Sequence, residues 1–454
     1  VMTKGEKGEP IQSTGTAFAN IGVIVIDDAT KKIESNSLFE IKEDTAKDAT
    51  VAAAAQKIID RIDKEYGAVF AKSEVVLNGA KAPNGNRDSE TNNGDLITDA
   101  MVWKILQDKE SLTVDADHVV AVTNGGGIRK AINPGDVTKK NINEVLPFGN
   151  TVVTIYITGA ELLEALEAST YCTPDAIGGF PQVSGINYTI STAVAYDANA
   201  ETYPASTYYG PKSINRVTIN SVNGKEFKAD DTYAVITNDF CGGGGDTYYA
   251  FAAATAKFDT GIPLDEVVME YITAELKGVI GKQYAAPQGR ILMNPFKDVK
   301  VSSWFGKYVI DLYNDGIING TSATTYAPND TLTWGAALKL LLVSSGDLKA
   351  EDATGADWLK NTMAKAVELG IAPEDADGKA LITRLAFCQT AAKLNKLAES
   401  KTESPFPDCT DGYVMALVDA KVINGMTETT FEPSATLTRA QIAKIIYQLN
   451  LIEK

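Results

Sequence analysis

The sequence is poor in the side chains that build metal centres. It contains one histidine, His118, and four cysteines among 454 residues. The cysteines form neither a C-x-x-C pair nor any other metal-ligand spacing. One imidazole is too few for a catalytic metal centre built from histidines, and we interpret His118 as a structural or surface residue. Two alternatives stay open for the cysteines: buried free thiols, or one or two disulfides, with Cys388 and Cys409 as one pair.

The chain is also short of positive charge and of long apolar runs. Lys plus Arg number 42 against 59 Asp plus Glu, so the net charge is −17. A nucleic-acid binder needs basic surface to displace counterions, and an anionic membrane attracts polybasic segments, so the composition disfavours both classes. No apolar run of about 18 residues is present, which excludes a transmembrane helix. Apolar residues still make up 44%, which is enough for packed cores in about two to four domains.

The N-terminal segment predicts one strand and one long helix. Residues 22–27 form a short apolar run bounded by turn residues, which is typical of a buried strand. Residues 48–66 carry apolar side chains at helical spacing and end at Gly67, a C-terminal stop. We expect this helix to join two units. The chain begins with Val1 and has no recognisable signal peptide, so we expect a processed or partial chain.

Residues 70–292 alternate strand and helix patterns, as expected of an α/β or α+β domain. The expected strands are residues 75–77, 119–122, 152–156, 217–219 and 233–236. The expected helices are residues 94–107, 159–169, 246–256 and 264–277. Loops rich in Gly, Asn or Asp follow three strand ends, at residues 124–127, 147–150 and 241–246. Loops held by a rigid sheet are where binding sites usually form.

After residue 293 an internal repeat replaces this alternation. The pairs Gly320 and Gly425, Pro328 and Pro433, and Thr333 and Thr438 are each separated by 105 residues. A shorter middle copy has Thr383 in the place of Thr333. Each copy predicts a helix, a turn and a second helix that begins after the Thr, because Thr before an apolar-periodic run is an N-cap pattern.

Five segments in order resemble the C-terminal, substrate-binding domain of the 5′-nucleotidase and UDP-sugar hydrolase family. They are residues 87–101, 124–129, 146–150, 182–185 and 237–246. Independent turns and core positions would not reproduce that order. The resemblance implies an α/β (α+β) domain over residues 69–293 that binds a nucleoside or nucleotide.

The resemblance also implies roles for individual residues. The implied substrate-binding residues are Arg87, Asn124, Gly126, Gly127, Arg129, Phe148, Phe240 and Asp246. The two phenylalanines match aromatics that sandwich the nucleobase, and stacking is worth about 1–3 kcal/mol per base. Asp246 matches the acceptor of the ribose hydroxyls. The two arginines match those that reach the phosphate, because guanidinium groups pair with phosphate oxygens in a bidentate manner, and the glycines let backbone N–H groups approach an anion.

Each of these residues also has an ordinary structural alternative. The glycines could form a tight turn, each Phe could be a core residue, Asp246 could cap a helix, and the two arginines could be surface charges.

Catalysis in this family belongs to a separate metallophosphatase domain. Two divalent metals, held by Asp, His and Asn ligands, clamp the attacking and leaving oxygens there. Residues 1–45 resemble the last strands of that domain, and residues 46–68 resemble its linker helix. The resemblance therefore implies a longer parent protein that supplies both metals and the catalytic residues, while this chain contains no metal ligands, cofactor or catalytic residue.

Residues 294–350, 351–402 and 403–454 resemble three S-layer homology repeats, which fold together as one α-rich, pseudo-threefold unit. In that family a Thr-Arg-Ala-Glu-type motif places an Arg in a groove that binds an acidic cell-wall polymer. Arg439 matches the motif and Arg384 matches it partly. The first repeat has Trp334 there, so its groove is either degenerate or stacks on sugar rings. The ordinary alternative for the arginines is a solvated helix start.

Together the two resemblances imply an extracellular, cell-wall-anchored nucleotide phosphohydrolase of the 5′-nucleotidase type. This chain would carry nucleotide recognition and anchoring. The implied partners are a nucleoside or nucleotide and a secondary cell-wall polymer or peptidoglycan, with S-layer-like self-association also open; nucleic acid and a membrane span are not expected. The alternative function is that of a non-catalytic, structural wall protein that keeps a nucleotidase-like domain.

Overall fold

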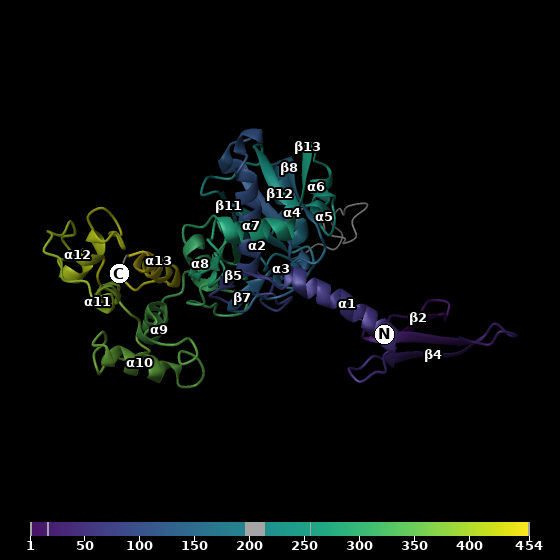
Figure 1. The fold of residues 1–454 in the computed structure, drawn as a ribbon. Coiled ribbons are helices and arrows are strands. Elements are labelled where there is room, and N and C mark those ends of the chain that lie inside the picture. Colours follow the sequence, from purple (N-terminus) through teal and green to yellow (C-terminus); the bar gives the residue numbers. More distant parts are fainter. Residues whose placement is uncertain (1, 16–17, 196–213, 255, 453–454) are drawn as a thin grey trace. The chain divides into compact units, whose positions relative to one another are not determined.

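The computed structural model describes all residues except 1, 16–17, 196–213, 255 and 453–454 (Figure 1). The chain divides into two compact units, residues 1–68 and residues 69–454. No helix in the described part of the chain is both long and apolar enough to cross a lipid bilayer.

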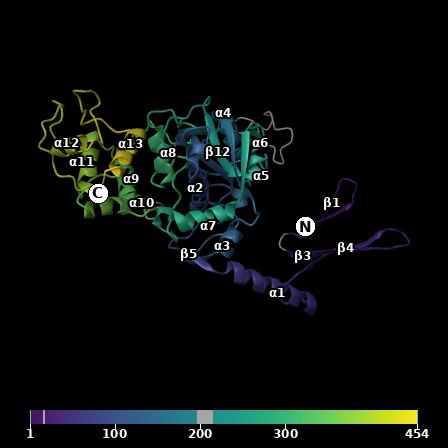
Figure 2. The ribbon, with the colours of Figure 1, turned by 45° about the horizontal axis from the view of Figure 1, so that its top comes forward.

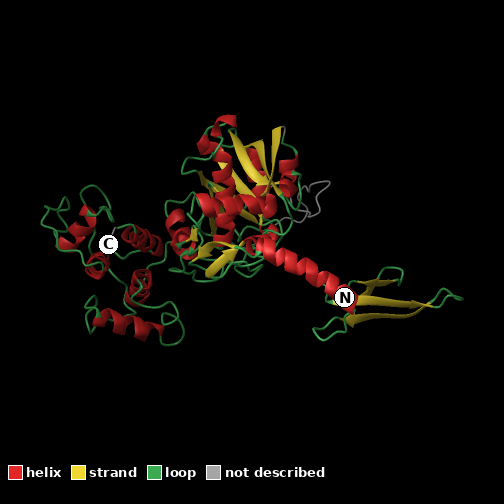
Figure 3. Cartoon of the chain, viewed as in Figure 1, coloured by secondary structure: helices red, strands yellow, loops and turns green. Residues whose placement is uncertain are grey.

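Two β-hairpins and one helix make up the first unit (Figure 3). The antiparallel pairs are β1 (Met2–Lys4) with β2 (Pro10–Gln12) and β3 (Asn20–Ile26) with β4 (Ile33–Glu40). The expectation of a buried strand is wrong for this chain, because Ile24 and Val25, on opposite faces of β3, are both exposed. An apolar strand is buried on both faces only where other layers cover it, and within the described residues β3 pairs only with β4.

The expected helix forms as α1 (Ala49–Tyr66). Its N-terminus is capped by the Asp48 carboxylate, which accepts hydrogen bonds from the N–H groups of Thr50 and Val51, and its C-cap is Gly67. The helix is amphipathic, as the sequence predicts, but none of its residues is buried.

A five-stranded mixed sheet forms the centre of the second unit. The strand order is β13 (Ala256–Pro263), β8 (Thr151–Thr158), β12 (Thr232–Asn238), β6 (Val119–Asn124) and β9 (Pro181–Ser184). Alternate residues of β6 point to opposite faces, so that Ala121 packs against α2 (Asn92–Leu106) and α7 (Leu264–Ala274), and Val122 joins the core beneath α4 (Gly159–Ser169). Helices therefore cover both faces (Figure 2), which confirms the expected α/β (α+β) class.

Two three-stranded sheets complete this domain. Their orders are β11 (Val217–Val222), β10 (Ile186–Ile190), β15 (Ile291–Met293), and β14 (Val279–Ile280), β5 (Val69–Ser73), β7 (Gly135–Thr138). The strand expected at 75–77 is wrong, because this segment makes only an isolated bridge from Leu77 to Ile132. The helix expected at 246–256 is shorter than predicted and forms only as α6 (Tyr249–Ala252). It cannot begin at Asp246, because this residue has a positive φ of 51°, which a right-handed helix excludes.

Six helices build the C-terminal part of the second unit. They are α8 (Gly306–Asn314), α9 (Trp334–Ser345), α10 (Trp358–Glu368), α11 (Arg384–Leu394), α12 (Gly412–Asp419) and α13 (Arg439–Asn450). Thr333, Thr383 and Thr438 each cap the second helix of a repeat, as predicted. Isolated β-bridges join Thr331 to Thr438, Thr333 to Leu381 and Thr383 to Thr436. Each repeat thus bonds to the other two, which produces the expected pseudo-threefold, α-rich unit.

Of the two alternatives for the cysteines, the structure confirms free thiols. Cys241, Cys388 and Cys409 are buried, Cys172 is half-buried, and all four are free thiols. Burial raises the pKa of Cys388 to about 12, so this thiol is protonated and unreactive at neutral pH.

Candidate functional site

All eight substrate-binding residues predicted from the sequence surround one cavity of about 430 Å³ in the nucleotidase-like domain. Its lining consists of Arg87, Asn124, Gly126, Gly127, Arg129, Phe148, Asn150, Gly178, Phe240 and Asp246. Asn150 and Gly178 were not predicted. Asn150 ends the segment 146–150, so its place in that motif could have indicated it, whereas Gly178 lies outside the five segments.

The cavity lies where two neighbouring parallel strands end. β6 ends at Asn124 and β12 ends at Asn238, and the two strands pair in parallel. Their carboxyl ends therefore meet at one edge of the sheet, the usual position of a ligand site in such sheets. The chain then turns sharply through the glycines of residues 125–127. A Cβ atom on Gly125 would lie only 1.6 Å from the carbonyl oxygen of Asn86, so this turn requires glycine.

A buried pair of polar side chains forms one wall of the cavity. The Nδ2 atom of Asn124 donates a hydrogen bond of 2.8 Å to Oδ2 of Asp246. Burial raises the pKa of Asp246 above its ordinary value, while the hydrogen bond from Asn124 and the charge of Arg87 lower it. These two contacts favour the ionised carboxylate, which can accept hydrogen bonds but not donate them. Asp246 is not a helix N-cap, which removes its structural alternative.

The two phenylalanines at the cavity are not core residues. Phe148 is 61% exposed and Phe240 is 48% exposed. Phe240 lies on the short helix α5 (Asp239–Gly242), and its ring rests over Gly245, where a Cβ atom would lie 2.6 Å from ring carbons. The Arg129 guanidinium lies 5.6 Å from the centroid of the Phe148 ring and donates to the carbonyl oxygen of Gly126. Two exposed aromatic faces at one cavity can hold a planar ring.

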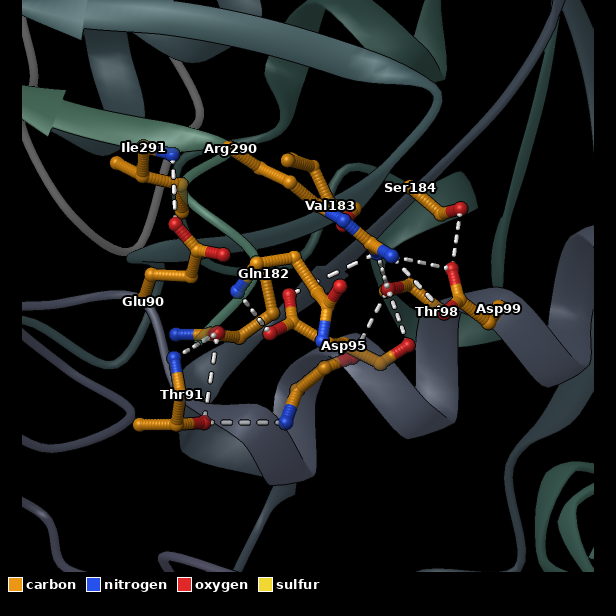
Figure 4. A network of polar contacts seen from close by, with 12 residues as sticks. Glu90, Thr91, Asp95, Thr98, Asp99, Gln182, Val183, Ser184, Arg290 and Ile291 are labelled. Atoms are coloured by element: carbon orange, nitrogen blue, oxygen red, sulfur yellow. Dashed lines mark hydrogen bonds and ion pairs between the residues drawn. The ribbon is translucent and has the colours of Figure 1, made fainter. Parts of the chain in front are cut away.

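A buried network holds the loop that carries Arg87 (Figure 4). Gln182 of β9 donates from Nε2 to the carbonyl oxygen of Ser89 at 2.7 Å, and its Oε1 accepts from the N–H group of Thr91 at 3.0 Å. These bonds connect segment 182–185 to segment 87–101. Arg87 Nε is buried and has no hydrogen-bond partner among the described residues. The Arg87 side chain also lines the cavity, and a guanidinium group is a natural donor for an anion.

Three carboxyl groups and one guanidinium lie deeper in the same network. Arg290 donates to Asp99 at 2.9 Å and approaches Asp95 at 3.6 Å (Figure 4). Burial and the neighbouring Glu90 raise the pKa of Asp95 to about 8, and burial also raises the pKa of Glu90. Two carboxylates with one shared cation resist simultaneous ionisation, so this pair retains a proton at neutral pH.

The arginines of the two matching Thr-Arg motifs are engaged inside the repeat unit. Arg384 is only 6% exposed, donates to the carbonyl oxygen of Asn424 at 2.6 Å and lies 4.6 Å from the centroid of Phe431. Arg439 donates to the carbonyl oxygens of Tyr326 and Asn319 at 2.7 and 2.8 Å. Each arginine therefore binds a turn of another repeat, so neither is simply a solvated helix start.

A smaller cavity of about 170 Å³ opens beside Arg384. Trp304, Asn424, Gln441 and Lys444 are among its lining residues, and the buried Arg384 Nε has no hydrogen-bond partner among the described residues. Residues from all three repeats meet here. Lys444 and Trp304 were not predicted as binding residues.

A related cluster lies beside Arg439. The Lys339 ammonium lies 5.4 Å from the ring centroid of Trp358. Burial lowers the pKa of Lys339, and the positive charge of Arg439 lowers it further. Trp334 instead packs partly buried against the hydrophobic cores of the repeats.

The described residues contain no group of three or more His, Cys, Asp or Glu side chains arranged to hold a metal ion. The side chains present therefore do not fit a two-metal centre, and no metal-dependent step is assigned to them. His118 contacts Asp117 at 2.6 Å and Asp231 at 3.3 Å, which agrees with its interpretation as a structural residue.

Family comparisons agree with both parts of this architecture. Residues 69–253 match the family described as "5'-nucleotidase, C-terminal domain", and residues 295–335 and 408–443 match the S-layer homology domain. The chain therefore contains a 5′-nucleotidase C-terminal domain followed by S-layer homology domains. Helices α10 and α11 of the middle repeat lie between the two matched ranges. Because S-layer homology domains anchor proteins to the cell wall or S-layer, the chain is an extracellular, wall-associated protein.

Individual relatives are similar to this chain over part of their length. The chain is 32% identical over 289 residues to the trifunctional nucleotide phosphoesterase protein YfkN of Bacillus subtilis (strain 168), covering 63% of this chain and 18% of that protein. It is 31% identical over 254 residues to Protein 5NUC of Lutzomyia longipalpis, covering 54% of this chain and 41% of that protein. The chain thus spans less than half the length of both relatives.

A solved 5′-nucleotidase precursor from Thermus thermophilus is 27% identical in sequence. The alignment covers 64% of this chain and 54% of that chain, with a TM-score of 0.46.

Proposed function

We propose that residues 69–293 bind a nucleoside or nucleotide in the 430 Å³ cavity, as the recognition part of a cell-wall-anchored 5′-nucleotidase. The main support for this proposal is that two exposed Phe rings and two arginines surround the same cavity. The base stacks between Phe148 and Phe240, and Asp246 accepts hydrogen bonds from the ribose hydroxyls. Arg87 and Arg129 pair with the phosphate oxygens, which are the natural partners of guanidinium groups.

The proposed role of this chain in hydrolysis is binding and orientation. In this proposal, cleavage of the phosphate ester belongs to a metallophosphatase domain, where two divalent metals would supply Lewis-acid stabilisation. The residues of this chain hold the base and the ribose, and thereby fix where the phosphate group is presented.

Calorimetry with adenosine and AMP tests the recognition site. Replacing Phe240 with Ala removes one stacking face worth about 1–3 kcal/mol, so the affinity should fall about 5- to 150-fold. The matched control is Phe258→Ala, which removes another exposed ring, from β13, that does not line the cavity. If the unmodified chain gives no binding heat with any nucleoside or nucleotide, the recognition role is wrong and the structural wall protein becomes the better account.

We further propose that the S-layer homology unit binds an acidic cell-wall polymer in the 170 Å³ cavity. The carrying observation is that Arg384 and Lys444 line this cavity together with the exposed indole of Trp304, and that no carboxylate is among its described lining residues. Two cations suit a carboxylated sugar, and the indole face can stack on a pyranose ring. The cluster of Arg439, Lys339 and Trp358 offers a second site of the same chemistry.

Co-sedimentation with purified wall sacculi tests the anchor. Lys444→Gln should reduce binding several-fold without a change in melting temperature, whereas Lys360→Gln, at an exposed lysine of α10, should leave binding unchanged. Arg439→Ala should also reduce binding, but it removes contacts between repeats as well. Sacculi stripped of their secondary polymer should retain no chain if that polymer is the ligand. Undiminished sedimentation of the Lys444 variant would contradict the role of this cavity.

A further inference from the structure

Asn238 lies outside the lining of the nucleotide cavity, but its side chain contacts two segments that form it. It is 3% exposed. Its Nδ2 atom donates to Oγ1 of Thr123 at 2.9 Å and to Oδ1 of Asn124 at 3.1 Å. Its Oδ1 atom accepts a hydrogen bond of 2.8 Å from the backbone N–H group of Cys241. Both the NH₂ group and the oxygen of the Asn238 side-chain amide therefore have hydrogen-bond partners at this edge of the sheet.

These contacts determine which way the Asn124 amide faces. The N–H group of Cys241 is an obligatory donor, so the oxygen of the Asn238 amide must point toward it. The Nδ2 atom of Asn238 then faces Asn124, which must present its oxygen in return. The remaining end of the Asn124 amide is its NH₂ group, and this group donates to the Asp246 carboxylate at 2.8 Å. The backbone N–H group of Cys241 thus orients the Asn238 amide, which in turn orients the Asn124 amide. The Asn124 amide then donates to the Asp246 carboxylate.

The same side chain also positions the stacking ring. Asn238 is the N-cap of α5, and this helix carries Phe240. An N-cap that accepts from the third residue of the helix determines how the chain enters its first turn. Asn238 therefore connects the placement of the exposed Phe240 ring to the orientation of the Asn124 and Asp246 pair.

We propose that Asn238 is a positioning residue for nucleotide recognition, and that it acts by orienting the Asn124 amide toward Asp246 while capping the helix of Phe240. This inference rests on the proposed nucleotide-binding function. Asn238 itself does not line the 430 Å³ cavity. Because of these hydrogen bonds, the Asp246 carboxylate is already in position before the ribose binds. Binding then costs little conformational entropy at this residue.

Asn238→Asp separates positioning from capping. A carboxylate still caps α5, but it has no hydrogen to donate to Asn124. The Asn124 amide must then turn over to donate toward the new carboxylate, and its oxygen faces the Asp246 carboxylate, where two acceptors repel each other. The affinity for adenosine, which carries no phosphate, should fall about 10-fold or more at pH 7.5, while the melting temperature stays within a few degrees of the unmodified chain.

The pH dependence of this loss distinguishes positioning from general damage. At acid pH the introduced carboxyl group takes up a proton and can again donate to Oδ1 of Asn124, so most of the lost affinity should return. The other ionisable groups around this site include Asp246, Asp239, Asp265, Arg87, Arg129 and the Cys241 thiol. They are present in both proteins, so the measured quantity is the ratio of the two affinities for adenosine between pH 7.5 and pH 5.

Two further variants complete the experiment. Asn220→Asp is the matched control, because Asn220 of β11 also donates from Nδ2 to two side chains, Asn187 and Thr189, but does not line the nucleotide cavity. It should bind adenosine as the unmodified chain does. If Asn238→Asp is poorly folded, Asn238→Ser replaces it: serine caps the helix but is too short to reach Asn124, so affinity should fall without recovery at acid pH.

Three results would overturn the inference. If the adenosine affinity of Asn238→Asp lies within twofold of that of the unmodified chain at pH 7.5, the hydrogen bond from Asn238 to Asn124 has no effect on binding. A loss that is the same at pH 5 as at pH 7.5 would show that the donor to Asn124 is not what matters. Absence of adenosine binding by the unmodified chain would contradict the proposed function itself, and this inference would fall with it.

Discussion

The side chain of Asn124, at the end of β6, donates a hydrogen bond of 2.8 Å to the carboxylate of Asp246, which lies 122 residues later in the chain. Both residues are buried, and both line the nucleotide cavity. Burial by itself opposes a charge on Asp246, while Asn124 and Arg87 favour it. The carboxylate is therefore held as an acceptor at a defined place, and the first prediction follows from this.

Asp246→Asn should weaken the binding of adenosine but not that of 2′,3′-dideoxyadenosine. A hydrogen bond to a charged acceptor is worth about 1.5–3 kcal/mol, which corresponds to a loss of about 10- to 150-fold for the ligand with both hydroxyls. Asn tolerates the positive φ of this position, so the fold should persist. Calorimetry with both ligands measures the difference. Equal losses for the two ligands would show that Asp246 does not contact the ribose hydroxyls.

Asp95→Asn should remove part of the pH dependence of stability. Glu90, Asp99 and Arg290 face this carboxyl group, and its pKa of about 8 in the folded chain lies far above its ordinary value of 3.8. The folded state thus binds the proton more tightly, and this contribution is complete below about pH 4 and is lost as the pH rises through 8.

The variant should therefore match or exceed the unmodified chain in melting temperature, with an advantage that grows toward pH 9 and amounts to about 2–4 °C per kcal/mol. Thermal unfolding at pH 5, 7 and 9 measures this. Asp108→Asn, at an exposed position after α2, is the control and should follow the unmodified chain. An advantage that is constant with pH would contradict the raised pKa.

The imidazole of His118 should titrate above pH 6.5. Its hydrogen bond to Asp117 is the main cause of a raised pKa, and Asp231 contributes less. Its stabilising contribution is therefore complete below pH 6.5 and is lost as the pH rises through the pKa of the folded state. Because the chain has one histidine, a single imidazole resonance can be followed by proton NMR. Asp117→Asn should lower this pKa, and a value at or below 6.5 in the unmodified chain would contradict the prediction.

Gly245→Ala should reduce nucleoside affinity by displacing the Phe240 ring. A Cβ atom at this position would lie 2.6 Å from ring carbons, which real contacts do not allow. Gly242→Ala, at the end of α5, is a nearby control, because its Cβ atom would meet the nearest atom at an ordinary 3.4 Å. We expect about a 10-fold weaker binding of adenosine for the first variant, from partial loss of a stacking contact, and no change for the second. Equal affinities of the two variants would show that the ring can move without cost.

Local structure in this protein was largely predictable from neighbouring residues. Helix α4 spans the expected residues 159–169, because Thr158 and Glu161 form a reciprocal capping box at its start. The second helix of each repeat begins after the expected Thr for the same kind of reason. Strands were less predictable, because a strand depends on which partner lies beside it. Residues 75–77 have the composition of a strand but form only one isolated bridge.

The composition and motifs of the chain alone determined its class, its repeats and the residue types of the proposed nucleotide site, because periodicity and caps are properties of short segments. Only the tertiary structure decided what those residues do. It leaves Phe148 and Phe240 exposed at a cavity, and it buries Arg384 against Asn424 of another repeat. The parallel pairing of β6 with β12 brings Asn124 to Asn238, 114 residues away. Such contacts depend on strand order, which no local pattern encodes, and the geometry of the site follows from that order.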